Sequence, residues 1–174
     1  MLLDDDGREV PDGQPGELFS CSPYCFDGYW NRPDKTREAF RGDYCTVGDV
    51  ALRDEDGFIR LIDRKKNIII TGGENVYPTE IEAALAGHPA LRDVAVIGLP
   101  DDKWGERVHA VVVPRDGAAI DPGALLDWCK PRLAGYKRPR SVTVAAPDDL
   151  PRTATGKVQH RLLRQRIIET ENRS

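Results

Sequence analysis

The chain has 174 residues, of which 40% are hydrophobic and 31% are charged, and its formal net charge at pH 7 is −4. This length and apolar content suffice for one ordinary domain, or for a small domain with part of another. The acidic balance argues against a dedicated nucleic-acid-binding protein and against a protein of membrane surfaces. No apolar run approaches the length of a membrane span, so we expect no transmembrane segment.

The four cysteines and three histidines do not form a metal-binding pattern. Cys21 and Cys25 are close in the sequence, but no Cys or His pair at zinc spacing accompanies them. The first ten residues hold three consecutive aspartates and no apolar signal-peptide core. We therefore expect no metal site, reduced cysteines and a cytoplasmic location.

Charge is unevenly distributed, with an acidic start and a basic stretch over residues 130–166. The basic stretch indicates either a local anion site or a solvated helix face. Nucleic-acid binding through it would depend strongly on salt, but Tyr136 is the one aromatic residue among these charges. We therefore expect no nucleic-acid partner.

The first third of the chain is predicted to be rich in strands and turns. Residues 16–20 favour a strand, and 32–40 favour a short helix with Pro33 near its start. The clearest hairpin lies in residues 49–64, where two apolar-rich runs flank the turn sequence RDEDG.

After Asp63 the pattern changes to alternating strands and helices. Residues 78–87 favour a helix with Pro in its first turn and Gly87 at its end. The predicted elements in chain order are a strand (67–71), that helix, two strands (93–100 and 106–115), a helix (121–133), a strand (141–146) and a helix (157–170). This β-α-β-β-α-β-α order can close one small α+β core.

Three short motifs are weak when each is taken alone. TATGK lacks the spacing of a phosphate-binding P-loop, and Lys157 within it could be an ordinary exposed loop lysine. ITGGENVYP lacks the third glycine of a dinucleotide fingerprint, so Gly72 and Gly73 could form a plain tight turn. Asp49, in VGD, could simply end a turn.

In this order, however, the motifs resemble the C-terminal third of the AMP-forming acyl-CoA synthetases. Five blocks carry the resemblance: GELFSCSPYCFDGYWN, GDYCTVGDV, GFIRLIDRKKNIIITGGENVYPTEIEAAL, GLPDDKWGERVHAVVV and LPRTATGKVQHRLLR. The form DRKKNIIITGGENVYPTEIE is similar to the fatty-acyl and related CoA ligases. The adenylation domains of peptide synthetases, which usually have an arginine-rich version there, rank second.

The resemblance implies a division into three parts and a two-step reaction. Residues 1–62 would be the tail of a large N-terminal adenylation domain, mainly its β-barrel portion, 63–69 a hinge, and 70–174 the mobile C-terminal domain. A carboxylic acid, expected to be a fatty acid, would react with ATP to give an acyl-adenylate and pyrophosphate. CoA would then take the acyl group and release AMP.

The resemblance also assigns residues to the nucleotide and the hinge. Asp49 would accept the ribose hydroxyls, and Arg64 would reach the ribose or a phosphate. Lys66 would stand at the hinge about which the domain turns between the two steps. The family's usual threonine before Gly-Asp is replaced here by Val47, with Thr46 one place earlier.

Two further segments would each serve one step. Gly72 and Gly73 would line the tunnel for the pantetheine arm of CoA, where a side chain would obstruct the thiol. Lys157 would be the catalytic lysine of the first step, because a mobile cation stabilises negative charge that develops on phosphate.

The expected partners follow from what lies outside the matched blocks. The family's ATP loop, its acyl pocket and most of its Mg²⁺ ligands belong to the upstream domain, so we expect this chain alone to be inactive. Exposed strands could pair two copies into a homodimer. The remaining alternative from another class is a non-catalytic, stand-alone binding or interaction module.

Overall fold

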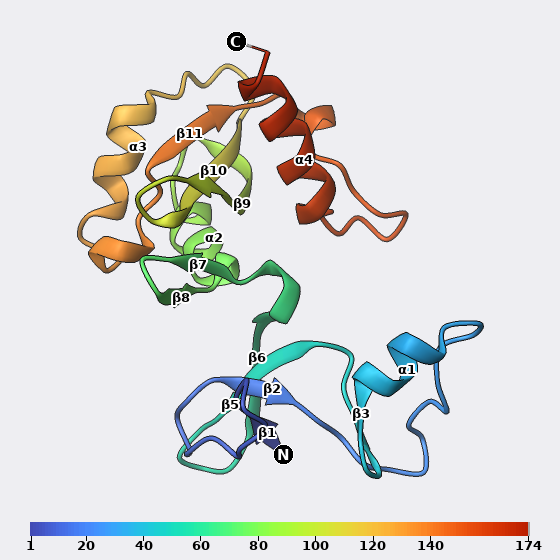
Figure 1. The fold of residues 1–174 in the computed structure, drawn as a ribbon. Helices are drawn as coiled ribbons and strands as arrows, with labels where there is room; N and C mark the ends of the chain where they lie inside the picture. The colour runs from blue at the N-terminus through green and yellow to red at the C-terminus, as the bar shows by residue number, and fades with distance from the viewer. Residues whose placement is uncertain (174) are drawn as a thin grey trace. The chain divides into compact units, whose positions relative to one another are not determined.

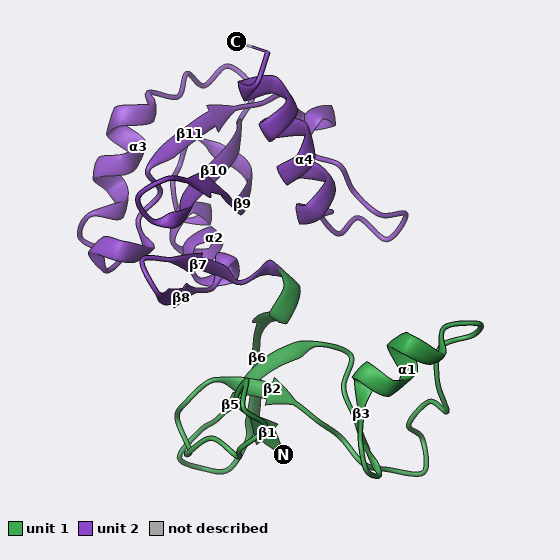
Figure 2. Ribbon diagram, in the orientation of Figure 1, with its two compact units in different colours: residues 1–66 green, residues 67–174 purple. Residues whose placement is uncertain are grey.

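The computed structural model describes residues 1–173, and the chain divides into two compact units, Met1–Lys66 and Asn67–Ser174 (Figure 2). Helices and sheets are mixed, which confirms the expected α+β class. The division falls within the segment 63–69 that the sequence predicts as a hinge, and hinge motion itself stays a prediction. No helix among the described residues is long and apolar enough to cross a membrane.

Unit 1 is built on an antiparallel sheet with the strand order β1-β2-β5-β6. Its strands are β1 (Leu2–Leu3), β2 (Gly16–Leu18), β5 (Asp49–Arg53) and β6 (Ile59–Arg64). Beside this sheet are helix α1 (Pro33–Ala39) and a small hairpin of β3 (Phe40–Arg41) and β4 (Tyr44–Cys45). The sequence did not predict β1, β3 or β4, which are two residues long and carry no clear alternation.

The predicted hairpin is confirmed as β5 and β6, and its turn chemistry explains why it forms. The Asp54 carboxylate accepts the N–H groups of Asp56 (3.1 Å) and Phe58 (2.8 Å), and Gly57 supplies the positive φ of 84°. A β-bulge between Val50 and Ala51 then shifts the register and places Asp49 opposite Arg64.

Unit 2 contains a five-stranded sheet in which β10 pairs with β7, β9 and β11 (Figure 1). The strands are β7 (Ile69–Thr71), β8 (Glu74–Val76), β9 (Leu91–Asp101), β10 (Gly105–Pro114) and β11 (Ser141–Val144). The helices are α2 (Pro78–Ala86), α3 (Pro122–Cys129) and α4 (His160–Glu171). The expected order of strands and helices is confirmed, with β8 as an additional strand.

The alternation of side chains along β10 gives unit 2 two cores. Val108 and Val112 belong to a cluster with Leu85 of α2 and Leu125 of α3. Val111, one position out of phase, belongs to a second cluster beneath α4. The sheet is therefore covered by α2 and α3 on one face and by α4 on the other.

Two helix boundaries differ from the sequence-based prediction. Helix α4 begins at His160 rather than Lys157, because Val158 is engaged in a β-bridge with Arg152 and Gln159 N–H donates to Pro151 O at 2.8 Å. Helix α3 ends at Cys129, two residues before a proline that cannot continue it. The first correction leaves Lys157 on a turn in front of the helix.

A buried histidine joins the parallel pair β10 and β11. His109 is 2% exposed, and its ring nitrogens lie 2.7 Å from Ser141 Oγ and 3.1 Å from Thr143 Oγ1. Burial lowers its pKa from 6.5 to about 4, with Glu171 opposing and Arg107 reinforcing the shift. His109 is therefore a neutral core residue near pH 7.

Candidate active-site segments

The two residues that the sequence assigns to nucleotide binding in unit 1 are in contact. Arg64 Nε lies 2.7 Å from Asp49 Oδ1, and Arg64 Nη1 donates to Val47 O at 2.9 Å. Arg64 is exposed and the Asp49 side chain is 21% exposed. One guanidinium thus holds both the carboxylate and the loop that leads to it.

Thr46 closes the loop in front of Asp49. Its Oγ1 accepts the N–H of Gly48 at 2.9 Å and donates to Glu17 Oε1 at 2.9 Å. Val47, at the family's threonine position, is 52% exposed. Thr46 therefore supplies a loop-closing hydroxyl, a role that its shifted position in the sequence did not reveal.

The predicted hinge, residues 63–69, contains a lysine that is ion-paired to unit 1. Lys65 Nζ lies 2.8 Å from Asp5 Oδ1 and 2.9 Å from Glu17 Oε2. Partial burial opposes protonation of this amine, but the two carboxylates prevail and raise its pKa. Lys66 is exposed, and its side chain has no ion pair within residues 1–173. Lys65 thus attaches the start of the linker to unit 1, a role that the sequence did not indicate.

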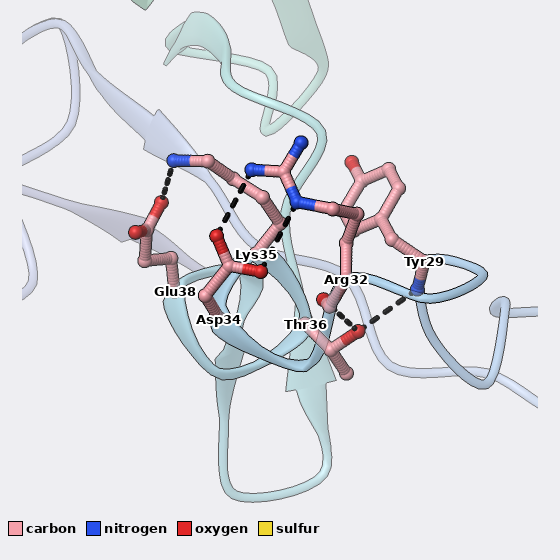
Figure 3. Close-up of polar contacts among 6 residues, drawn as sticks. All are labelled: Tyr29, Arg32, Asp34, Lys35, Thr36 and Glu38. Carbon is pink, nitrogen blue, oxygen red and sulfur yellow. Dashed lines mark hydrogen bonds and ion pairs between the residues drawn. The ribbon is translucent and has the colours of Figure 1, made fainter.

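A shallow hollow of about 310 Å³ lies between α1 and the Thr46–Gly48 loop. Its charged lining includes Arg32 and Lys35, which pair with Asp34 and Glu38 as Figure 3 shows. Arg32 makes two hydrogen bonds to Asp34 and lowers the pKa of that carboxyl group to about 2.

The same α1 segment is fixed at its start by one hydroxyl. Thr36 Oγ1 accepts the N–H of Tyr29 at 2.9 Å and donates to Arg32 O at 3.1 Å (Figure 3). Helix α1 and its ion pairs therefore form one side of the hollow, next to the loop that precedes Asp49.

In unit 2, Gly72 and Gly73 form the tip of the β7–β8 hairpin. Their φ values are +60° and +85°, a conformation that favours glycine at both positions. A Cβ at Gly72 would lie 3.0 Å from Trp104 Cε3, whereas a Cβ at Gly73 would meet no described atom within 4 Å. The tip is therefore packed on one side and open on the other.

An aromatic and cationic surface adjoins this tip. Trp104 O accepts the N–H of Gly72 at 2.8 Å. The Arg140 guanidinium lies 4.4 Å from a Trp104 ring centroid, and Lys103 Nζ lies 4.8 Å from one. Sequence reasoning missed this surface, because Arg140 is far from the other two residues in the chain.

Lys157 is presented by the turn that the Arg152–Val158 bridge closes, just before helix α4. It is exposed, and its side chain makes no hydrogen bond or ion pair with any described residue. Leu150 and Pro151, just before the turn, are buried. The backbone of the turn is hydrogen-bonded, but the exposed Lys157 side chain is unpaired, so its ammonium is available to bind a phosphate.

The structure brings together Asp49 and Arg64 but not the two predicted segments of unit 2. Figure 1 shows the β7–β8 hairpin and the turn before α4 on different sides of that unit. Residues 1–173 contain no group of three or more His, Cys, Asp or Glu side chains suited to a metal ion, and all four cysteines are free.

Comparison with known proteins bears on these segments. Residues 80–157 match the family described as the AMP-binding enzyme C-terminal domain. The chain is 47% identical to a feruloyl-CoA synthase from Amycolatopsis sp., over 92% of this chain and 32% of that protein. It is 44% identical to a long-chain-fatty-acid–CoA ligase from Escherichia coli O6:H1, over 94% of this chain and 28% of the ligase.

A solved structure is similar over the same span. The crystal structure of ATP-bound MatB from Rhodopseudomonas palustris has 41% identity and a TM-score of 0.87, covering 95% of this chain and 33% of that one. The chain thus spans about a third of the length of the relatives it matches.

Proposed function

We propose that the chain is the C-terminal part of an ATP-dependent, AMP-forming acyl-CoA ligase. The match of residues 80–157 to the AMP-binding enzyme C-terminal domain and the similarity to acyl-CoA ligases support this proposal. The chain would work with an N-terminal adenylation domain, and the protein that contains both is called the full-length ligase below. The proposal includes a cytoplasmic location and Mg²⁺ held mainly by the N-terminal domain.

The observation that carries the proposal is the exposed, unpaired Lys157 on its anchored turn. In the first step a carboxylate oxygen attacks the α-phosphate of ATP, and pyrophosphate leaves. Negative charge builds on the phosphate oxygens, and the Lys157 ammonium would stabilise it. Asp49, held by Arg64, would accept hydrogen bonds from the ribose hydroxyls and fix the nucleotide.

The second step would use the Gly72–Gly73 tip. The CoA thiol attacks the acyl carbonyl carbon of the adenylate and AMP leaves. Open space beside Gly73 supports a passage for the pantetheine arm. The neighbouring Trp104 and Arg140 offer a stacking face and a positive charge, which suit the nucleotide end of CoA.

Two classes of acid are candidates. A fatty acid is the expectation from the sequence motifs, and the similarity to a long-chain-fatty-acid–CoA ligase supports it. The 47% identity to a feruloyl-CoA synthase supports a hydroxycinnamic or related aryl acid as the second candidate. The acyl pocket would lie in the N-terminal domain, so both classes belong in the test.

The test incubates the full-length ligase with ATP, Mg²⁺, CoA and panels of fatty and hydroxycinnamic acids, and follows AMP release. We expect acid-dependent AMP formation that requires Lys157. The 174-residue chain alone should give no turnover. Robust acyl-CoA formation by the chain alone, or a full-length Lys157→Ala variant with normal adenylation, would refute the proposal.

A further inference from the structure

The turn that presents Lys157 has a fixed internal shape. Thr153 N–H donates to Lys157 O at 2.8 Å, and Lys157 N–H donates back to Thr153 Oγ1 at 3.1 Å. Gly156 N–H donates to Thr153 O at 2.9 Å, and Gly156 has a φ of +83°. These bonds shape the turn, but none of them attaches it to the sheet of unit 2.

The first attachment is made by Arg152. Its Nη1 donates to Gly156 O at 2.6 Å, inside the turn, while its Nη2 is ion-paired with Asp93 Oδ2 on β9. The other Asp93 oxygen accepts the N–H of Val94 at 2.9 Å, which fixes the carboxylate on the strand. Arg152 thus bridges the turn and β9.

The second attachment lies on the other side of the turn. His160 Nε2, at the start of α4, lies 2.9 Å from Glu82 Oε1 on α2. The same oxygen accepts the N–H of Val96 on β9 at 2.9 Å. The His160 and Glu82 side chains are 20% and 23% exposed, so solvent screens this pair less than a surface pair.

We propose that Asp93–Arg152 and Glu82–His160 are positioning pairs that hold the Lys157 turn in the geometry in which its ammonium meets the nucleotide. The inference rests on the proposed role of Lys157 in adenylation. A catalytic group that is displaced by about 1 Å can lose about 100-fold in rate, so both ends of a short turn need fixing. Asp93 has a second effect. Because it neutralises the charge of Arg152, Lys157 is the cation of this turn that can bind the phosphate.

The first experiment uses the 174-residue chain and needs no activity. Amide hydrogen exchange is measured at Gly156 and Lys157 in Asp93→Asn and Glu82→Gln. Each variant should speed exchange at both amides by about 5- to 10-fold, because each removes the negative charge of one attachment and so weakens it. Asp127→Asn is the matched control, since it breaks the exposed Asp127–Lys130 pair on the α3 side. Unchanged exchange in both variants would overturn the inference.

The second experiment separates positioning from general damage. In the full-length ligase, Asp93→Asn should slow acyl-adenylate formation by about 10- to 100-fold, while the conversion of supplied acyl-adenylate by CoA stays unchanged. Asp93→Glu keeps the charge and should restore most of the rate. Equal losses in both half-reactions, or no loss in adenylation, would overturn the inference.

Lys157→Ala in the same assay distinguishes the two possible failures. If Lys157→Ala slows adenylation and Asp93→Asn does not, the positioning pairs are wrong and the proposed function stands. If Lys157→Ala leaves adenylation unchanged, the proposed function fails first.

Discussion

Asp49 and Arg64 face each other across the β5–β6 ladder, and Arg64 Nε lies 2.7 Å from Asp49 Oδ1. The pairing depends on the Asp54–Gly57 turn and on a β-bulge between Val50 and Ala51, which shifts the register by one residue. A carboxylate with one oxygen on Arg64 retains acceptor capacity for ribose hydroxyls, because an ionised carboxylate offers about four lone-pair positions. The contact therefore orients the Asp49 carboxylate and leaves it able to accept further hydrogen bonds.

We predict that Asp49→Asn in the full-length ligase lowers kcat/KM for ATP by about 10- to 100-fold, as expected for hydrogen bonds to a charged acceptor. Arg64→Met should also raise the KM for ATP, because it removes the expected contact of Arg64 with the nucleotide and loosens Asp49. Steady-state pyrophosphate release measures both. Asp56→Asn, at the exposed tip of the same hairpin, is the control and should behave as wild type. An unchanged kcat/KM for ATP in Asp49→Asn would contradict the assignment.

Substitutions at Lys157 and at Gly73 should each slow a different half-reaction. Lys157→Ala should slow adenylate formation by about 100- to 1,000-fold and leave thioester formation from synthetic acyl-adenylate near normal. Gly73→Leu should do the reverse, since its side chain would enter the open side of the hairpin tip. The reactions are followed separately by rapid quench.

The position of the added side chain matters in this comparison. Gly72→Ala is less informative, because its Cβ would press against Trp104 at 3.0 Å and disturb packing as well as passage. Gly73→Leu adds backbone strain of about 1–2 kcal/mol, which a thermal melt can quantify. Equal effects of Lys157→Ala and Gly73→Leu on both steps would argue against two separate roles.

His109 should make the chain less stable in acid. Its folded-state pKa, about 4, lies below the unfolded value of 6.5, so the unfolded state binds more protons between these values. The contribution of His109 to the free energy of unfolding should be complete well above pH 6.5 and fall as the pH drops towards 4. The loss attributable to His109 should approach about 3 kcal/mol.

Urea unfolding of the chain at several pH values between 4 and 7.5 measures this slope. His109→Gln can still hydrogen-bond to Ser141 or Thr143 but cannot titrate, so its profile should be flatter by that amount. Identical pH profiles for the two proteins would show that His109 does not contribute.

The isolated chain should self-associate through β6. This strand is the edge of the unit 1 sheet, and Phe58, Ile59 and Leu61 are 71%, 44% and 60% exposed. An open apolar edge pairs readily with another chain. We expect concentration-dependent dimers in sedimentation experiments, reduced by Leu61→Lys and unaffected by Ala83→Lys on the exposed side of α2. A monomer at all concentrations would refute the homodimer expected from the sequence.

The sequence by itself determined the elements that depend on neighbouring residues. The Asp54–Gly57 turn specifies the β5–β6 hairpin. Proline in the first turn, with apolar residues three and four positions apart, specifies α2. The ordered motifs were also sufficient to indicate the family and the Lys157 and Gly72–Gly73 segments. The turn and helix signals lie within a few residues of the features they predict, whereas the family was indicated by the order of blocks along the chain.

Only the tertiary structure decided the contacts between distant segments. His109 meets Ser141 because β10 and β11 pair in parallel, and Arg152 meets Asp93 because the turn before α4 folds back onto β9. The late start of α4 has a more local cause, since the bridge to Arg152 engages Val158 before the helix can begin. Such pairings depend on how the sheet and its two cores assemble, and a local pattern carries no information about partners about 30 or more residues away.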